Sequence, residues 1–153
     1  MRTILASIFA APAPVLAFGL GGLIPFVGLA ALGMFAPGTL QLFWLVTLTQ
    51  YGAVILAFVG ALQWGYAVIG KATGTQAWIR YGWSVLPALI GCLSLQFSVW
   101  SGLRLQAGAL IVSIVVDRAF AARSPAPEWL LSVRYLLTAV AVTCLVVASY
   151  AGS

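Results

Sequence analysis

Long apolar stretches, separated by short polar turns, make up most of the chain. Five of them are candidate transmembrane helices: residues 15–34, 39–69, 78–97, 103–116 and 129–150. A helix of about 20 apolar residues spans a bilayer, and it satisfies its own backbone hydrogen bonds where lipid offers none. The pattern therefore predicts an all-α polytopic membrane bundle of about five transmembrane helices.

Residues 1–14 depart from this pattern, because Pro12 and Pro14 interrupt a short apolar run. We interpret this segment as a lead-in that lies at the membrane interface, with a cleaved signal peptide as the alternative. Residues 15–150 are then expected to form a single transmembrane helical domain.

Two of the predicted helices have unusual lengths. The stretch 39–69 is longer than one bilayer thickness at about 1.5 Å per residue. It is therefore tilted, broken near residues 50–52, or extended by an interfacial first part. The stretch 103–116 is short for a span, so its helix is expected to continue about one turn past Val116.

The composition excludes a soluble fold. Hydrophobic residues make up 63% of the chain and charged residues only 6%, whereas a soluble domain carries about 25% charged residues. The seven basic residues are too scattered along the chain to follow a nucleic-acid backbone. Lipid, rather than nucleic acid, is the expected partner of this surface.

The positions of the basic residues predict the orientation, since five crossings place the termini on opposite sides. With the N-terminus inside, that side collects Arg2, Lys71, Arg80, Arg118, Arg123 and Arg134. The other side holds only Arg104. The positive-inside rule therefore predicts a cytoplasmic N-terminus and a C-terminus on the opposite side. The expected location is the bacterial inner membrane.

The sequence lacks the patterns of catalytic and metal sites. It has no histidine, and Cys92 and Cys144 lie far apart in apolar runs, so the usual ligands of zinc and haem are missing. It also has no acid pair, no nucleophile beside a base and no glycine-rich phosphate loop. The favoured prediction is a protein without enzymatic activity and without a metal site, with a membrane enzyme that uses the polar cluster as the open alternative, and its cofactors are left unknown.

Several polar and aromatic residues fall at similar depth in the cytoplasmic half of the predicted bundle. Polar groups in hydrocarbon need a partner or a wet cavity. The candidate ligand-binding set is Gln63, Trp64, Trp83, Ser84 and Arg134. Asp117 is expected to form an ion pair with Arg80 or Arg134. That pair either pins helix ends or belongs to a site for a small anion or amphiphile.

A row of small residues is expected to form the packing face of the second helix. Its members recur every four positions and are Ala53, Ala57, Ala61 and Gly65, with Gly52 and Gly60 in a neighbouring row. Small side chains let helices approach closely in lipid, where no strong hydrophobic force drives them together. The row predicts either the packed centre of the bundle or the seam of a homodimer.

Several motifs together resemble the domain-of-unknown-function 3429 family. They are Tyr51 to Gly60 followed by Gln63-Trp64-Gly65, Trp83 to Pro87, Asp117-Arg118, Pro127-Glu128-Trp129, and Arg134 with Thr138. The resemblance implies a small multi-helix inner-membrane protein of bacteria or mitochondria. It also implies a histidine before the Trp-Gly of the first motif, where this chain has Gln63, and that difference argues against metal or haem ligation there.

Two functions are compatible with these observations. The first is a non-enzymatic accessory or assembly subunit of a larger membrane complex, with other membrane subunits or a second copy as partners. It rests on the small-residue row, the minimal loops and the lack of catalytic groups. The alternative is a binder or carrier of a small amphiphile, such as a quinone or a sterol-like or porphyrin-like molecule. Its pocket would lie between the second, third and fifth helices.

Overall fold

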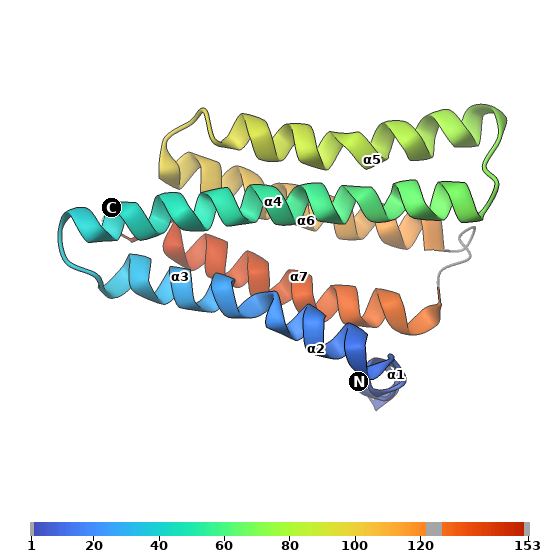
Figure 1. Cartoon of the computed structure of the whole chain (residues 1–153), viewed down its shortest axis with the longest axis horizontal. Helices are drawn as coiled ribbons and strands as arrows, with labels where there is room; N and C mark the ends of the chain where they lie inside the picture. The colour runs from blue at the N-terminus through green and yellow to red at the C-terminus, as the bar shows by residue number, and fades with distance from the viewer. Residues whose placement is uncertain (1, 122–126, 152–153) are drawn as a thin grey trace.

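The computed structural model describes residues 2–121 and 127–151, and within these ranges every regular element is an α-helix (Figure 1). The helices are α1 Arg2–Phe9, α2 Ala13–Gly21, α3 Leu23–Phe35, α4 Thr39–Ile69, α5 Gly74–Ser94, α6 Val99–Ala121 and α7 Glu128–Ala148. The predicted all-α class is confirmed. Arg123, which the orientation argument used, lies outside the described residues.

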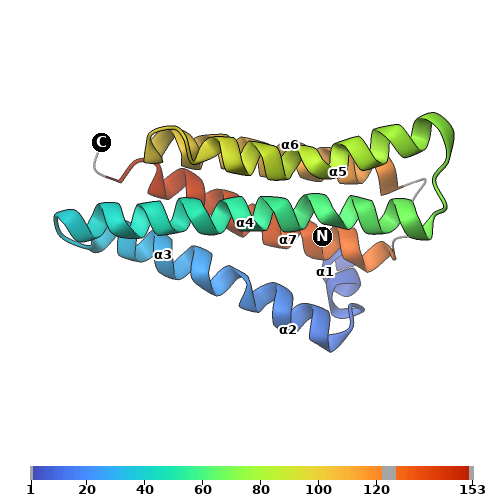
Figure 2. The ribbon, with the colours of Figure 1, turned by 45° about the horizontal axis from the view of Figure 1, so that its top comes forward.

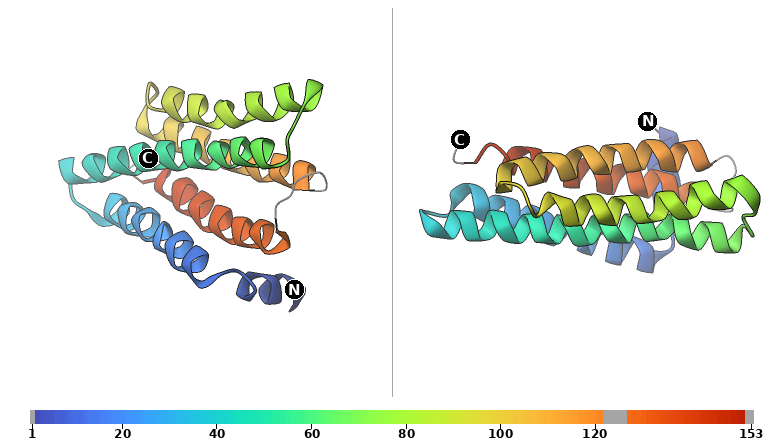
Figure 3. Two further views of the ribbon diagram at one scale, coloured as in Figure 1. Left: turned by 45° about the vertical axis from the view of Figure 1, so that its right-hand side comes forward. Right: turned by 90° about the horizontal axis from the view of Figure 1, so that it is seen from above.

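Four helices form a ring around the core. α3 packs against α4, α4 against α6, α6 against α7, and α7 back against α3. α5 lies outside this ring, against α4 and α6. The long helices run side by side (Figures 1 and 3), and α7 ends beside the α5–α6 turn, whereas α1 lies in the half of the bundle nearer the α4–α5 turn.

The described helices include four that are long and apolar enough to cross a membrane. They are Ala13–Phe35, Thr39–Ile69, Val99–Ala121 and Trp129–Ala148. α5 is less apolar, but its 21 residues extend about 31 Å. Its short turns to α4 and α6 lie at opposite ends of the bundle, so α5 runs back across the thickness that those helices span (Figure 1). The described helices thus include five segments of membrane length, of which four are also apolar enough to cross a membrane, and the fifth crossing stays a prediction.

The helix bounds explain the two unusual lengths. α4 is one unbroken helix of 31 residues, about 46 Å long, so the break considered near residues 50–52 is absent. α6 begins at Val99 and ends at Ala121, which gives it a full membrane span and extends it past Val116. α5 begins four residues earlier and ends three residues earlier than the stretch 78–97.

The first span bends where α2 meets α3. Pro25 has no backbone N–H and clashes with the carbonyl one turn earlier, at Gly21, so the helix is interrupted at Gly22. The Tyr51 hydroxyl on α4 donates a hydrogen bond to the Gly22 carbonyl oxygen at 2.8 Å. The Tyr51 ring also packs edge-on against Phe26, with centroids 5.0 Å apart. The side chain of Tyr51 therefore stabilises the bend.

The bend directs α2 away from α4. α3 is in contact with α4 along the core, whereas α2 contacts α3 and α7 and buries none of its own residues (Figure 2). Of the segment 1–14, residues 2–9 form the short helix α1, residues 10–12 lead into α2, and α1 packs against α7. The ring of four helices is thus closed at the α3 end and wider at the α2 end.

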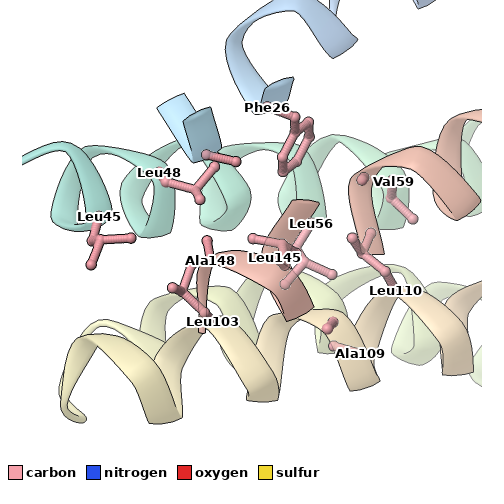
Figure 4. Packing of buried hydrophobic residues seen from close by; sticks show 13 residues of the cluster. Phe26, Leu45, Leu48, Leu56, Val59, Leu103, Ala109, Leu110, Leu145 and Ala148 are labelled. Carbon is pink, nitrogen blue, oxygen red and sulfur yellow. The ribbon is translucent and has the colours of Figure 1, made fainter. Parts of the chain in front are cut away.

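The hydrophobic core lies inside the closed part of the ring. Figure 4 shows its main contributors, which are Phe26 from α3, Leu45, Leu48, Leu56 and Val59 from α4, Leu103, Ala109 and Leu110 from α6, and Leu145 and Ala148 from α7. Many other large apolar side chains point outward, including Phe18, Phe58 and Trp78. An outer surface of this kind is stable in lipid and would be unstable in water.

α4 approaches its neighbouring helices most closely at glycine positions. A Cβ at Gly60 would overlap the Ser84 carbonyl oxygen of α5, and a Cβ at Gly52 would overlap the Gln106 side chain of α6. The buried positions continue with Gln63 and Ala67. The buried positions Gly52, Leu56, Gly60, Gln63 and Ala67 are four residues apart except for the three-residue step from Gly60 to Gln63. That shorter step offsets the rotation of the four-residue steps and keeps these residues on the face that contacts α5 and α6.

The small-residue row expected to pack is divided by the structure. Ala53 contacts Gly91 of α5, and Ala57 is half-buried. Ala61 and Gly65 are exposed, and no described atom lies within 4 Å of a Cβ built at Gly65. The reason is geometric: a strict four-residue repeat rotates about 40° per step around an α-helix, so the row leaves the contact face.

Candidate functional site

Three polar side chains meet where the ring of helices is wide. Gln63 comes from α4, Asp117 from α6 and Arg134 from α7, and we call them the Gln63–Asp117–Arg134 cluster. Gln63 Nε2 donates a hydrogen bond to Asp117 Oδ1 at 2.6 Å. Arg134 Nη2 lies 2.6 Å from Asp117 Oδ2. The Asp117 carboxylate therefore links α6 to both α4 and α7.

The cluster lies inside the helices and not at their ends. Gln63 is six residues before Ile69 and Arg134 six residues after Glu128, about 9 Å along each helix. Asp117 is four residues before Ala121, about 6 Å from the end of α6. A carboxylate and a guanidinium at this depth stabilise each other, since neither is well solvated by lipid.

Four buried atoms of the cluster have no hydrogen bond among the described residues, and two of them, Asp117 Oδ2 and Arg134 Nη2, face each other in the ion pair. Gln63 is only 4% exposed and Arg134 only 7%. Neither Gln63 Oε1 nor Arg134 Nε has a hydrogen-bond partner within residues 2–121 and 127–151. Buried polar atoms are nearly always satisfied in proteins, so two unsatisfied atoms in one cluster are unusual.

A cavity of about 230 Å³ adjoins the cluster between α4, α6 and α7. The three residues of the cluster form its polar wall, and Tyr66 lies beside them. The rest of the wall is apolar and consists of Leu62, Phe120, Ala121, Pro127, Leu130 and Leu131. An apolar cavity with a few convergent polar groups is the usual form of a small-molecule site. We refer to it as the cluster cavity.

A second cavity of about 340 Å³ lies next to the first, at the turn between α4 and α5. Tyr66 lines both cavities. The second is also lined by Arg80, which is 4% exposed and whose guanidinium lies 5.0 Å from the centre of the Phe120 ring. Phe120 thus lines the cluster cavity and also contacts Arg80.

The structure brings some of the predicted site residues together and separates others. Gln63 and Arg134 line one cavity, and Asp117 pairs with Arg134 rather than with Arg80. Trp64 and Ser84 are not part of the cavity wall. Trp64 is half-exposed and stacks edge-on against Tyr81, and the Ser84 hydroxyl donates to the Tyr81 carbonyl oxygen at 2.6 Å.

Trp83 is also outside the cavity, because it belongs to α5 and the cavity is formed by α4, α6 and α7. Sequence reasoning missed Tyr66, Phe120 and Leu130 as wall residues. A signal was present, since Tyr66 and Leu130 lie one helical turn from Gln63 and Arg134, on the same faces.

A second buried polar contact lies nearer the other end of the bundle. Gln106 on α6 is fully buried, and its Nε2 donates to the Thr49 carbonyl oxygen and to Ser94 Oγ, both at 2.7 Å. Ser94 Oγ in turn donates to the Gly91 carbonyl oxygen at 2.6 Å. This Gln106 contact joins α4, α5 and α6 and carries no charge.

The charged residues are distributed unevenly between the two ends of the bundle. Lys71, Arg80, Arg118 and Arg134 lie towards the end that holds the cluster. Arg104 lies towards the other end, where its Nη2 donates to the Ser149 carbonyl oxygen at 3.3 Å. No group of three metal-binding side chains occurs in the described part of the chain.

The fold and this surface define the class of the molecule. Apolar helices of membrane length, an exposed apolar exterior and a small polar interior are those of a polytopic integral membrane protein. Within that class, the chain belongs to the family described as a protein of unknown function (DUF3429), whose model matches residues 11–150. The resemblance inferred from the motifs is thereby confirmed.

Two curated relatives share the similarity. The chain is 35% identical over 138 residues to transmembrane protein 69 of Xenopus tropicalis, covering 89% of this chain and 53% of the relative. It is 25% identical over 152 residues to transmembrane protein 69 of Mus musculus, covering 95% of this chain and 59% of the relative. The chain thus spans between half and three-fifths of the length of these relatives. No solved structure matches it.

Proposed function

We propose that the protein binds a small amphiphile in the cluster cavity, with the polar head of the ligand at the Gln63–Asp117–Arg134 cluster. The observation that carries this proposal is the convergence of three polar residues, Gln63, Asp117 and Arg134, on one side of an otherwise apolar cavity. A structural ion pair alone would not need a cavity beside it. The protein would act as a binder or carrier and not as an enzyme.

The position of the cavity supports a ligand that comes from the membrane. Its apolar wall is formed by side chains of three membrane-spanning helices, and α2, which could close the ring at this level, is directed away from α4. The apolar part of an amphiphile can therefore remain among apolar groups while its head reaches polar ones. Quinone-like and sterol-like molecules have this character.

The proposal is tested on the full chain purified from native membranes in nanodiscs. Native mass spectrometry and extraction of bound small molecules are expected to show a retained ligand. The variant Gln63→Met should lose most of it, because it removes the amide. The matched control Gln50→Met changes an exposed glutamine on the same helix and should retain it. Recovery of no ligand from wild-type protein, or equal retention by all three proteins, would contradict the proposal.

The accessory-subunit function has its own supporting observation, the exposed part of the small-residue row. Ala61 and Gly65 present a flat, small-residue face on α4, which is the kind of surface on which another membrane helix packs closely. Gly65→Leu is expected to abolish co-purification of a stoichiometric partner or a second copy. Gly28→Leu, a change at an exposed glycine of α3, serves as the control. Unchanged co-purification in Gly65→Leu would exclude this face.

The orientation and location remain part of the proposal. With the bundle end that holds the cluster towards the cytoplasm of a bacterial cell, the inner-membrane topology follows the positive-inside rule. Reporter fusions in the turn at residues 71–73 and after Ser153 are then expected in different compartments, cytoplasm and periplasm. Both reporters in one compartment would contradict five crossings.

A further inference from the structure

We propose that the second cavity, at the turn between α4 and α5, binds the phosphate group of an anionic phospholipid. We call it the turn cavity, and its wall consists of Tyr66, Gly70, Ala72, Gln76 and Arg80. This site goes beyond the proposed function, because it concerns a different cavity and a ligand of different chemistry. The proposal follows from the groups on the wall, from the charge of this end of the bundle and from the apolar surface around the turn.

The wall combines one side of each helix with the turn between them. Gln76 and Arg80 are four residues apart on α5, and Tyr66 and Gly70 are four residues apart at the end of α4, so each pair lies on one side of its helix. Arg80 is six residues after Gly74, the first residue of α5, which is about 9 Å along the helix. The turn cavity therefore extends from the turn to a basic residue inside the bundle.

The polar side chains of the wall are suited to an anion. A guanidinium is permanently charged, carries five N–H donors and matches the geometry of a phosphate group. Arg80 is only 4% exposed, and the packing of the Phe120 ring 5.0 Å from its guanidinium helps to hold it in place. The Gln76 amide and the Tyr66 hydroxyl can also donate hydrogen bonds. All three polar side chains of the wall are thus donors, and none of them is acidic.

The backbone of the turn adds to this preference. The N–H groups of residues 70–72 donate to carbonyl oxygens in the last turn of α4, so the negative end of α4 is largely capped. Thr73, at the start of α5, forms no side-chain cap hydrogen bond, and the first N–H groups of a helix have no partner within it. The positive end of α5 is therefore less well capped than the negative end of α4, which favours an anion at this turn.

The net charge of this end of the bundle also attracts an anion. Four basic residues of the described chain lie towards it, which are Lys71, Arg80, Arg118 and Arg134 (Figure 1). The whole chain has only two acidic residues, Asp117 and Glu128. Even if both carboxylates are neutralised by basic residues of this end, positive charge remains in excess. Basic pockets between membrane helices are typical sites for acidic lipid headgroups.

The surroundings of the turn favour a lipid as the source of the phosphate. Val68 and Ile69 at the end of α4 are 55% and 68% exposed, and Trp78 near the start of α5 is 84% exposed. Apolar side chains of this kind can contact acyl chains, and exposed tryptophans are typical of the membrane interface. A volume of about 340 Å³ is near the lower limit of small-ligand sites, about 300–1,000 Å³. The turn cavity can therefore hold the headgroup while the acyl chains remain on the outer surface.

The test measures lipid binding to the full chain in detergent micelles by native mass spectrometry, which resolves each bound lipid as a separate mass. The probes are dioleoylphosphatidylglycerol, dioleoylphosphatidylcholine and inorganic phosphate. The first phosphatidylglycerol is expected to bind about ten-fold more tightly than the first phosphatidylcholine, whose choline neutralises the phosphate. Equal binding of the two lipids would overturn the proposal. Displacement of phosphatidylglycerol by an equal concentration of inorganic phosphate would overturn the lipid as the source of the bound group.

Two substitutions in the first turn of α5 distinguish the turn cavity from the general charge of the surface. Gln76 lines the cavity and Thr75 is not part of its wall, and both residues are exposed. An acidic residue is favourable in the first turn of a helix, so Gln76→Glu and Thr75→Glu should both fold. Gln76→Glu is expected to weaken phosphatidylglycerol binding about ten-fold, and Thr75→Glu by less than about two-fold. Equal weakening by both would show that net charge alone attracts the lipid, and it would overturn the site.

A second pair of variants removes one positive charge each from the same end of the bundle. Arg80 lines the turn cavity, whereas Arg118 is exposed on α6 and is not part of the wall. The preference for phosphatidylglycerol should be lost in Arg80→Gln and retained in Arg118→Gln. A retained preference in folded Arg80→Gln protein would contradict the proposal. If the loss of a buried arginine prevents folding, the two exposed positions of the first pair decide the question.

Gln63→Met keeps this test separate from that of the proposed function. Gln63 lines the cluster cavity and is not part of the wall of the turn cavity. The variant should therefore bind phosphatidylglycerol as tightly as the wild-type protein, even where it loses the ligand of the cluster cavity. Loss of phosphatidylglycerol binding in folded Gln63→Met protein would place the lipid in the cluster cavity and overturn the assignment to the turn cavity.

Discussion

Two glutamines, each almost fully buried and each with an unpaired oxygen, have very different surroundings. Gln106 joins α4, α5 and α6 in a tightly packed contact, and its Oε1 is closed off by the backbone of Gly52. Gln63 is bonded to a charged partner and lies on the wall of a cavity. An unpaired buried amide is thus no sufficient sign of a ligand site. The adjacent space and the adjacent charge distinguish the two.

The difference arises from the helix that completes the ring. At the level of Gln106, α3 lies against α4 and large side chains such as Phe26 and Leu45 fill the interior (Figure 4). At the level of Gln63, α2 is directed outward from the bend at Gly22 (Figure 2). One proline-induced bend in the first span therefore gives the bundle a closed half and a half with a cavity.

The largest expected effect is the loss of one partner of the ion pair. Arg134→Leu should lower the free energy of unfolding by about 3–5 kcal/mol, because it leaves the Asp117 carboxylate buried and uncompensated. Unfolding in mixed micelles, followed by circular dichroism, measures this change. The double variant Asp117→Leu with Arg134→Leu should be more stable than either single variant. Additive losses would show that the two residues act independently and that the cluster is no charge-paired unit.

The next prediction compares the two glutamines directly. Gln63→Leu should lower the free energy of unfolding by about 1.5–3 kcal/mol, because a buried carboxylate loses a hydrogen bond. Gln106→Leu should lower it by only about 1 kcal/mol, because the groups that it releases are uncharged and remain bonded within their own helices. The same unfolding assay applies. A larger loss of unfolding free energy in Gln106→Leu than in Gln63→Leu would show that the Gln106 contact contributes more to stability than the Gln63–Asp117–Arg134 cluster.

Sequence reasoning predicted the fold better than the site. Hydropathy located α4 at residues 39–69 because both of its ends are marked by turn residues, Pro37-Gly38 before and Gly70 after. The ends of α5 and α6 were less well placed, since polar residues such as Gln76 and Arg118 continue a helix beyond its apolar core. An apolar pattern therefore locates the hydrocarbon region of a helix and not its last turn.

The candidate site was only partly predictable, because depth along a helix is visible in sequence and rotation is not. Gln63, Asp117 and Arg134 were recognised as polar residues at one depth. Trp64 follows Gln63 directly, which turns it about 100° around the helix and out of the cavity. The choice of Arg134 over Arg80 as the partner of Asp117 depends on α5 lying outside the ring, which only the tertiary structure shows.

A smaller effect is expected from one added methyl group in the closed half. Gly52→Ala places a Cβ against the Gln106 side chain, and overpacking of this kind should lower the free energy of unfolding by about 1–3 kcal/mol. Gly65→Ala is the matched control, since the described residues leave that position open, and its effect should be about zero. Equal effects of the two substitutions would contradict the close packing inferred at Gln106.

The smallest effect on stability should come from filling the cavity. Leu130→Phe adds an aromatic ring to the apolar wall near the cluster. The added ring has space, so the free energy of unfolding should change by less than about 1 kcal/mol. Retention of the amphiphile from native membranes should nevertheless be lost, because the ring occupies the volume that the ligand needs. If the cavity were only a packing defect, Leu130→Phe would instead raise the free energy of unfolding, and the wild-type protein would bind no ligand there. Unchanged stability with lost binding therefore separates a functional cavity from a defect, and retained binding would place the ligand elsewhere in the bundle.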